Sequence, residues 1–441
     1  MTAEQMEFRK AITVPGSYDV MVCGGGTAGV IAAIQAGRAG ARTLLVEKTG
    51  MLGGTVTMGG VNCPGVFFAW KRQVIAGIGW ELVMRCLKET GQSLPAPHND
   101  FEKRHGGYHV PVDRFVFAAL CDEAVVAAGV DILFHVMIAA VTPAGDGWMV
   151  TLHTKTGLSR RTARVLVDCT GDANAAALAG LPVRVPEENQ PATLSCHASG
   201  YDASALDVGA INRAFDAEVK AGRLRYTDAA WSMTGPDMGS WLNKAGENAS
   251  HVHHINAHDS EGKTRLELEA RKAFLRLYRF LRTQPGLEKL RIEYLAPECG
   301  VRETATIVGK KTVTVDDYTS GRVWEDAVCY SFYPIDLHVS SGSGIQGRQL
   351  DEGVVPTIPR GAMLPAGSRN FMAAGRCISS DRLANSALRV QATCMAVGQA
   401  AGAMAALVAR TGTEVESLPM SAIHGLLRAH GAIIPEGAPE R

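Results

Sequence analysis

The feature that most constrains this chain is a glycine-spaced turn near its start. An apolar run, Asp19–Cys23, ends in Gly24-x-Gly26-x-x-Gly29, and an alanine-rich run over 30–39 follows. This order predicts a buried strand, a tight turn and a helix whose N-terminus faces a phosphate group. Gly24 permits the turn, Gly26 lets the backbone approach the phosphates, and Gly29 lets the helix pack on the strand.

A second observation separates this turn from a chance match in a chain with 48 glycines. Another apolar run, Thr43–Val46, ends at Glu47, which lies 18 residues after Gly29. A carboxylate at about this separation commonly accepts a ribose hydroxyl. The two runs therefore predict parallel strands that bind a dinucleotide at their carboxyl ends; the alternative is a glycine-rich turn without a ligand.

Composition limits the classes of protein to which the chain can belong. With 441 residues, of which 46% are hydrophobic and 20% charged, it can bury a sizeable core in two domains or in one domain with a large insertion. The 44 basic and 44 acidic residues cancel. We therefore expect no nucleic-acid partner and no polybasic membrane contact.

The cysteines and the first residues both favour a cytoplasmic location. The ten cysteines are scattered without a Cys-x-x-Cys pair, which is typical of small buried thiols in a reducing compartment and not of a zinc site or a redox dithiol. Residues 1–15 are polar and lack the apolar core of a secretory signal. His254 and His258 have helical metal-ligand spacing, but their surroundings resemble a loop, so we expect no metal.

The remaining sequence predicts alternating strands and helices. Helices are expected over 73–89, 112–128, 173–178, 266–282, 390–410 and 418–430, and strands over 130–134, 137–141, 148–153, 164–168 and 370–374. Loops are expected over 48–65, 93–99 and 381–389. The apolar run 390–409 falls short of about 20 uninterrupted apolar residues, so we expect a helix packed inside the protein and no membrane span.

These elements predict an α/β fold. A Rossmann-like domain with a central parallel sheet and a small antiparallel ribbon is expected over 15–185 and 331–412. Residues 186–330, richer in proline, tryptophan and histidine, are expected to form an inserted α+β substrate domain. Residues 413–441 would form a C-terminal helix and tail.

Five blocks of the sequence resemble the FAD-dependent oxidoreductases with a glutathione-reductase-type FAD fold. The blocks are Gly24–Gly29 with Glu47, Leu52–Gly54, Val167–Asp172, Gly300–Thr304 with Tyr333–His338, and Ala374–Ser379 with Arg389–Gly402. The last block is the most specific. Relatives often carry an aromatic residue where this chain has Arg360.

The resemblance implies FAD as cofactor, held mainly by glycine backbones. The residues expected to contact it are Gly24, Gly26, Thr27, Ala28, Gly29, Glu47, Lys48, Gly53, Gly54, Thr55, Val136, Thr170, Gly171, Asp172, Gly375, Arg376, Arg389, Val390 and Gln391. Glu47 would hold the adenosine ribose, and the backbone of Val136 would contact the adenine. The helix that begins near Val390 would direct its positive end at the pyrimidine edge of the flavin, where it stabilises negative charge.

Four residues are candidates for catalysis. His338, beside Asp336, is the first candidate for handling a substrate proton; the alternative is a histidine held in a core hydrogen-bond network. Arg302 can bind a substrate carboxylate or carbonyl, or form a structural ion pair with Glu303 or Asp336. Cys63, in the glycine loop, can form a thioether to the flavin or face it, or be a plain buried thiol.

We therefore expect an enzyme that transfers a hydride from a small polar organic substrate to flavin N5. The chain has no second glycine fingerprint for NAD(P)H, so oxygen, a quinone or a carrier protein would reoxidise the flavin. One alternative is a reductase of an activated double bond. Another is a flavin-binding module without chemistry, in an assembly. A homo-oligomer is compatible with either.

Overall fold

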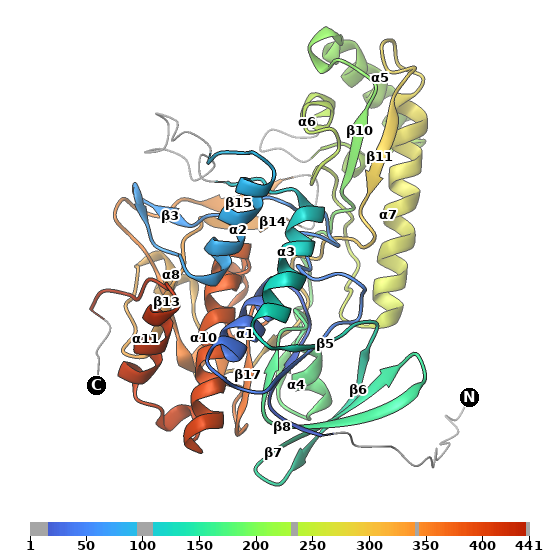
Figure 1. Ribbon diagram of the computed structural model, residues 1–441. Coiled ribbons are helices and arrows are strands. Elements are labelled where there is room, and N and C mark those ends of the chain that lie inside the picture. The colour runs from blue at the N-terminus through green and yellow to red at the C-terminus, as the bar shows by residue number, and fades with distance from the viewer. Residues whose placement is uncertain (1–15, 95–108, 231–236, 340–343, 438–441) are drawn as a thin grey trace.

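The computed structural model describes residues 16–94, 109–230, 237–339 and 344–437. Its largest element is a seven-stranded sheet on which the helices pack (Figure 1). The strand order is β5 (Asp131–Leu133), β2 (Thr43–Val46), β1 (Ser17–Cys23), β8 (Gly157–Asp168), β7 (Gly147–Thr154) and β6 (Met137–Ala144), and β17 (Phe371–Ala373) also pairs with β8. The predicted α/β class with a Rossmann-like sheet is confirmed.

Strand β8 joins the two parts of this sheet. Its first half pairs antiparallel with β7, which continues antiparallel to β6, and this is the predicted ribbon. Its second half lies parallel to β1 and β17, and β2 and β5 extend the parallel part. The burial of β8 follows this division, because Val165–Asp168 is buried on both faces while 157–160 is not.

Helix α1 (Thr27–Arg38) and helix α10 (Gln391–Thr411) lie side by side against the parallel strands (Figure 1). A Cβ atom at Gly398 would lie 2.2 Å from the carbonyl oxygen of Ala28, and one at Gly402 would lie 2.2 Å from that of Ala32. Only glycine allows this approach. By length and composition alone α10 could cross a membrane, but 89% of its most apolar window is buried inside the protein.

The remaining elements surround this centre. The other helices are α2 (Ile78–Glu89), α3 (Arg114–Ala127), α4 (Asn174–Leu178), α5 (Val208–Lys220), α6 (Met238–Asn243), α7 (Ser260–Leu281), α8 (Val315–Thr319), α9 (Arg382–Leu388) and α11 (Met420–Ala429). Short strands pair as β3 (Phe68–Ala69) with β4 (Arg72–Gln73), β9 (Val183–Arg184) with β12 (Thr306–Ile307), β10 (Cys196–Ser199) with β11 (Arg291–Leu295), β13 (Ala327–Tyr330) with β16 (Thr357–Pro359), and β14 (Ile335–His338) with β15 (Ile345–Arg348).

Three predicted boundaries are wrong for local reasons. Helix α2 begins at Ile78 and not at 73, because Gln73 pairs with Phe68 in a small hairpin. Helix α7 begins at Ser260, ahead of the predicted 266, because the Asp259 carboxylate accepts a 2.7 Å bond from the N–H of Gly262. Residues 382–388, predicted to be a loop, form α9, because Asp381 caps it in the same way.

Helix α7 runs along one side of the molecule beside β10 and β11 (Figure 1). The apolar side chains of α5, α6, α7, β10 and β11 form a hydrophobic cluster separate from the one around α1 and α10. The domain boundaries at 186, 331 and 413 stay predictions. Residues 1–15 and most of the predicted loop over 93–99 lie outside the described residues.

Candidate functional site

The carboxyl ends of the parallel strands meet one cavity of about 2000 Å³. Gly24 follows β1, Glu47 follows β2, Thr170 follows β8 and Gly375 follows β17, and all four line the cavity. A pocket for a small ligand typically measures about 300–1000 Å³. This cavity therefore has room for a dinucleotide and a second molecule.

Seventeen of the nineteen predicted cofactor residues line this cavity; the exceptions are Gly29 and Gly53. A Cβ atom at Gly29 would lie 1.8 Å from the carbonyl oxygen of Gly24, so this glycine permits the helix to pack on the turn. The N–H of Gly53 donates to the carbonyl of Gly25 at 2.9 Å, which joins the second glycine loop to the first. That the cavity-lining residues contact a cofactor stays a prediction.

The turn after β1 leaves open space where a phosphate would lie. Gly24 has φ +104°, and a Cβ atom there would lie 2.5 Å from the carbonyl oxygen of Cys169. Apart from its chain neighbours, the only atom of the described residues within 4.0 Å of a Cβ atom at Gly26 would be the Cα of Gly54, at 4.0 Å. Among the described residues no side chain caps α1, so its first N–H groups are available to an anion. These features fit a pyrophosphate.

Helix α10 presents a second uncapped N-terminus to the same cavity. Val390 and Gln391 line it, and no side chain of the described residues caps this helix either. The Nε2 of Gln391 donates to the carbonyl of Val61 at 2.7 Å, which ties the helix to the loop after β2. A helix N-terminus carries partial positive charge, which suits the electron-rich edge of a reduced flavin.

Glu47 is fixed against the glycine turn. One carboxylate oxygen accepts a 2.7 Å bond from the N–H of Gly25, and the other accepts two 2.8 Å bonds from the N–H and Oγ1 of Thr49. Lys48 lies farther out, half exposed, with its Nζ 3.0 Å from Glu298. Val136 lines the cavity beside them and donates its N–H to the carbonyl of Glu47 at 3.1 Å.

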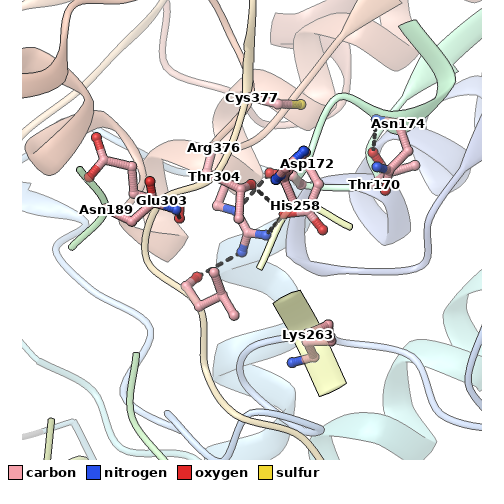
Figure 2. A network of polar contacts seen from close by, with 12 residues as sticks. Thr170, Asp172, Asn174, Asn189, His258, Lys263, Glu303, Thr304, Arg376 and Cys377 are labelled. Atoms are coloured by element: carbon pink, nitrogen blue, oxygen red, sulfur yellow. Dashed lines mark hydrogen bonds and ion pairs between the residues drawn. The ribbon is translucent and has the colours of Figure 1, made fainter. Parts of the chain in front are cut away.

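Arg376, which lines the cavity, connects three segments through the polar contacts drawn in Figure 2. Its guanidinium donates to the carbonyls of Gly171 at 2.7 Å and Val301 at 2.8 Å, and it contacts Asp172. Thr304 donates to the same carboxylate at 2.5 Å. The network holds the turn after β8 against the segment over 301–304.

One organising residue was not among the predicted site residues. Asp168, the last residue of β8, is completely buried and accepts hydrogen bonds from Thr170 and from the N–H of Ala176 at 2.9 Å. Burial raises the pKa of this carboxyl group. The sequence signal was present, because an acidic residue at the end of an apolar strand needs hydrogen-bond donors nearby.

A second part of the cavity lining carries charged and polar side chains, namely Arg302, Asp336, His338 and Arg389, and we call it the chamber. The Arg302 guanidinium is 8% exposed. It donates to Pro191 O at 2.7 Å, Thr193 Oγ1 at 2.9 Å and Asn248 Oδ1 at 3.1 Å, which are all neutral acceptors. Burial, and then the charge of Arg389, lower the pKa of Arg302 to about 9.

Neither predicted ion pair of Arg302 forms. Glu303 instead contacts Arg382 at 3.2 Å and accepts a bond from the N–H of Gln190 at 2.9 Å. Asp336 lies 3.5 Å from Arg389. Within the described residues no carboxylate lies within 4 Å of the Arg302 nitrogens, so this buried cation has no acidic partner.

Asp336 and His338 form a polar pair on β14. The Nε2 of His338 lies 3.4 Å from Asp336 Oδ2. Burial raises the pKa of Asp336, but the contact with His338 and the charges of Arg389 and Arg302 outweigh burial and hold that pKa well below its usual range. Burial, and then the charge of Arg302, lower the pKa of His338 to about 3. At neutral pH the pair is a carboxylate beside a neutral imidazole.

Cys63 lines the cavity and is exposed, so it is not a plain buried thiol; partial desolvation together with the charge of Glu247 raises the pKa of its thiol. A protonated thiol is a poor nucleophile. Tyr333 and His109 also line the cavity, with ring centroids 6.0 Å apart, and were not predicted. Arg360 does not line it; its guanidinium donates to the carbonyls of Val415 and Leu418.

A model of the family described as FAD dependent oxidoreductase matches residues 19–427. Among curated proteins, dihydrolipoyl dehydrogenase from Trypanosoma brucei brucei is 50% identical over 48 residues, which cover 11% of this chain and 10% of that protein. The match thus spans about a tenth of the length of this relative.

Several solved structures are similar at low identity. The OxyS anhydrotetracycline hydroxylase from Streptomyces rimosus is 12% identical with a TM-score of 0.41, over 94% of this chain and 66% of that chain. The p-nitrophenol 4-monooxygenase PnpA from Pseudomonas putida is 12% identical with a TM-score of 0.40, over 94% and 81%. A geranylgeranyl bacteriochlorophyll reductase-like protein from Thermoplasma acidophilum is 15% identical with a TM-score of 0.40, over 94% and 83%. No substrate follows from likenesses of this size.

Proposed function

The chain belongs to the FAD-dependent oxidoreductases, with FAD as its cofactor, and on this premise we propose that it oxidises a small polar organic molecule carrying a carboxylate or a similar anionic group. When bound, FAD supplies the hydride acceptor at N5. The observation that carries the proposal is the buried guanidinium of Arg302, which faces the cavity and has no acidic partner among the described residues.

Arg302 has the donors that such a substrate needs. Its two terminal nitrogens donate three hydrogen bonds to residues that are distant in sequence: one each to Pro191, Thr193 and Asn248. A guanidinium has five N–H donors, so two are left for a substrate carboxylate. Its planar guanidinium binds a carboxylate through two parallel hydrogen bonds, which fixes the orientation of the substrate as well as its location.

Asp336 and His338 would take the proton that leaves the substrate hydroxyl or amine. In the free protein both groups are weak bases: burial, and then the charge of Arg302, lower the pKa of His338, while the contact with His338 and the charges of Arg389 and Arg302 lower that of Asp336. An anionic substrate beside Arg302 would offset this charge and raise the pKa of His338 and Asp336. The base would therefore become stronger only when the substrate is bound.

The protein's part in the reaction is then binding, orientation and proton transfer. Arg302 binds the anionic group, and the Asp336–His338 pair accepts one proton while the hydride and its two electrons leave for the flavin. Oxygen or another acceptor would reoxidise the cofactor. In the reverse direction the same pair would donate a proton to an activated double bond.

Anaerobic flavin bleaching tests the proposal. The FAD-loaded protein is mixed with a panel of hydroxy acids and amino acids, and in parallel with the corresponding primary amides. We expect one or more acids to bleach the flavin, their amides to fail, and Arg302→Met to abolish the difference while retaining FAD. Equal bleaching by acid and amide would contradict an anionic substrate.

The same preparation distinguishes the alternatives. If no acid bleaches oxidised flavin but an α,β-unsaturated acid reoxidises photoreduced flavin, the protein is a double-bond reductase. If neither occurs and FAD remains bound, a flavin-binding module without chemistry is favoured. A cytoplasmic location and a homo-oligomer stay predictions.

A further inference from the structure

Four histidines follow one another from the chamber toward the protein surface. His338 Nδ1 lies 2.9 Å from His251 Nε2. The ring centroids of His251 and His253 are 5.4 Å apart, and those of His253 and His254 are 5.8 Å apart. His338 lines the cavity, and the other three histidines do not.

Exposure increases along this series. His338 and His251 are each 3% exposed, His253 is partly buried and His254 is exposed. The series therefore connects a buried position in the chamber to solvent through imidazole rings alone. Residues 251, 253 and 254 do not line the cavity, so these rings lead to solvent outside the cavity lining.

The backbone explains this placement. The N–H of Val252 donates to the carbonyl of Ala192 at 2.8 Å, and Ala192 donates back at 3.1 Å. In an extended segment of this kind residues two apart point to the same side, so His251 and His253 share one face. His254 has φ +58°, which ends the extended segment and turns the chain.

We propose that His338, His251, His253 and His254 form a path along which protons move between Asp336 in the chamber and solvent. The path rests on the proposed function, since it serves the proton that leaves the substrate. A neutral imidazole has one donor and one acceptor nitrogen, so each ring can accept a proton on one side and release one on the other. A ring rotation or one bridging water spans each of the two longer steps.

Burial and the charges around the path keep its inner ring neutral. Burial, followed by the charges of Arg302 and His338, holds the pKa of His251 far below its usual range, so this ring is neutral. Lys244 lowers it further. Because the surrounding cations disfavour a charged inner ring, a proton crosses these rings only when each ring accepts one proton on one nitrogen as it releases another from the second nitrogen.

The proton balance of one turnover is complete. An alcohol R₂CH–OH becomes R₂C=O when its hydride, with two electrons, leaves for the flavin and its hydroxyl proton passes to Asp336 and His338. Each later step breaks one N–H bond and forms another on the next ring, and His254 releases one proton to water. Tautomer change then restores the starting state.

The first experiment examines the path in the protein without FAD. With ¹⁵N-labelled histidine, NMR should detect a neutral ring pair with coupling between two nitrogens across one hydrogen bond, which His251→Gln abolishes. Asp336→Asn should change the tautomer of His338 and, through it, shift the His251 signals. Absence of the coupling, or His251 signals that Asp336→Asn leaves unchanged, would overturn the path.

The second experiment measures proton movement in the FAD-loaded protein. Two molecules of reduced methyl viologen supply two electrons and no proton, so reduction takes one proton from solvent, and a pH-sensitive dye follows its uptake. We expect His253→Ala to slow uptake about tenfold and added imidazole to restore it. His253→Gln, a milder change that cannot relay, should behave alike, and His153→Ala, at an exposed site on β7, should match the native rate.

Native-rate uptake by both His253 variants would overturn the proposal, as would slow uptake that imidazole does not restore. Failure of the proposed function gives a different result. If the protein holds no FAD, the NMR outcome alone decides the path. If FAD is bound but no organic acid bleaches it, the NMR outcome and the viologen outcome decide the path together.

Discussion

Two parts of the cavity, the dinucleotide end around the glycine turn and the chamber, are built by different means. At the dinucleotide end the backbone does the work: Gly24 and Gly26 leave space, and the N–H groups of α1 face it without a capping side chain among the described residues. In the chamber, side chains do the work: Arg302, Asp336 and His338 are buried or nearly so and polarise one another.

Because of this difference, affinity for the cofactor and selectivity for the substrate should depend on different residues. A site formed by backbone atoms depends on the conformation of the chain. It is lost when a new side chain fills the space, but it tolerates most other substitutions nearby. A side-chain site depends on charge, so it fails when a charge is removed even if the shape is kept. Substitutions at the two ends should therefore affect cofactor retention and substrate oxidation separately, and the following predictions test this from the largest expected effect to the smallest.

Gly26→Leu should abolish FAD retention. The new side chain enters the open space beside Gly54 and occupies the position of the pyrophosphate, so we expect affinity to fall by at least about a hundredfold, or about 3 kcal/mol. Absorbance of the purified protein near the flavin bands measures the effect. Gly29→Ala is the contrasting variant: its Cβ would lie 1.8 Å from Gly24 O, so it should lose FAD by unfolding, whereas Gly26→Leu should keep a native circular dichroism spectrum. Normal FAD binding by Gly26→Leu would disprove the backbone site.

Arg302→Met should leave FAD bound and remove substrate oxidation. Loss of a bidentate, charge-assisted contact should lower kcat/KM for flavin reduction by about a hundredfold, or about 3 kcal/mol. Stopped-flow bleaching with the best acid of the panel measures it. Arg302→Lys keeps the charge without the fork and should recover part of the rate. If FAD is lost together with activity, the two ends are not separable.

His338→Gln should make the protein without FAD less sensitive to acid. The pKa of His338 is about 3 when folded and about 6.5 when unfolded, so between these values the unfolded chain binds a proton that the folded chain does not. The free energy of unfolding is therefore not reduced by His338 at a pH above its unfolded-state pKa, and it falls as the pH decreases below that pKa. Between pH 7 and pH 4 the native protein should lose about 3 kcal/mol more than the variant.

Urea unfolding at both pH values provides the measurement for His338→Gln, and the exposed His153→Gln on β7 provides the control. A native protein and a His338→Gln variant that lose equal stability between the two pH values would show that His338 is not held neutral by burial and by the charge of Arg302.

Glu47→Ala should weaken FAD binding only moderately. The carboxylate accepts bonds from Gly25 and Thr49, and its loss removes support from the loop without filling the cavity. We expect about a tenfold weaker affinity, or about 1.4 kcal/mol, by fluorescence titration of the protein with FAD. An effect as large as that of Gly26→Leu would mean that a side chain, and not the backbone, dominates this end.

The same difference explains what the sequence revealed. The dinucleotide end follows from local patterns, since Gly24, Gly26 and Glu47 lie within 24 residues and strand–turn–helix spacing places them. The family and FAD were predictable for this reason. The chamber is assembled from 191, 248, 302, 336 and 389, so its geometry depends on tertiary contacts.

Particular residues show the limit. Arg302 was identified from its block, but its neutral partners Asn248 and Thr193 carry no motif, and neither proposed ion pair formed. From the sequence, His251 was recognisable only as part of a histidine-rich segment. Its contact with His338 spans 87 positions along the chain, so no local pattern indicates it. Short helices such as α9 were missed because a single capping aspartate, Asp381, decides them.

The register of α1 against α10 sets a length. Gly398 packs on Ala28, seven residues after α10 begins, whereas Ala28 is the second residue of α1. The two helices run parallel, so the start of α10 extends about six residues, or about 9 Å, beyond that of α1. The packing of the two helices therefore fixes the distance between their N-termini. If the start of α1 faces the phosphates and the start of α10 faces the flavin, as predicted, this offset separates the two partial positive charges, and a shorter nucleotide would reach only the first.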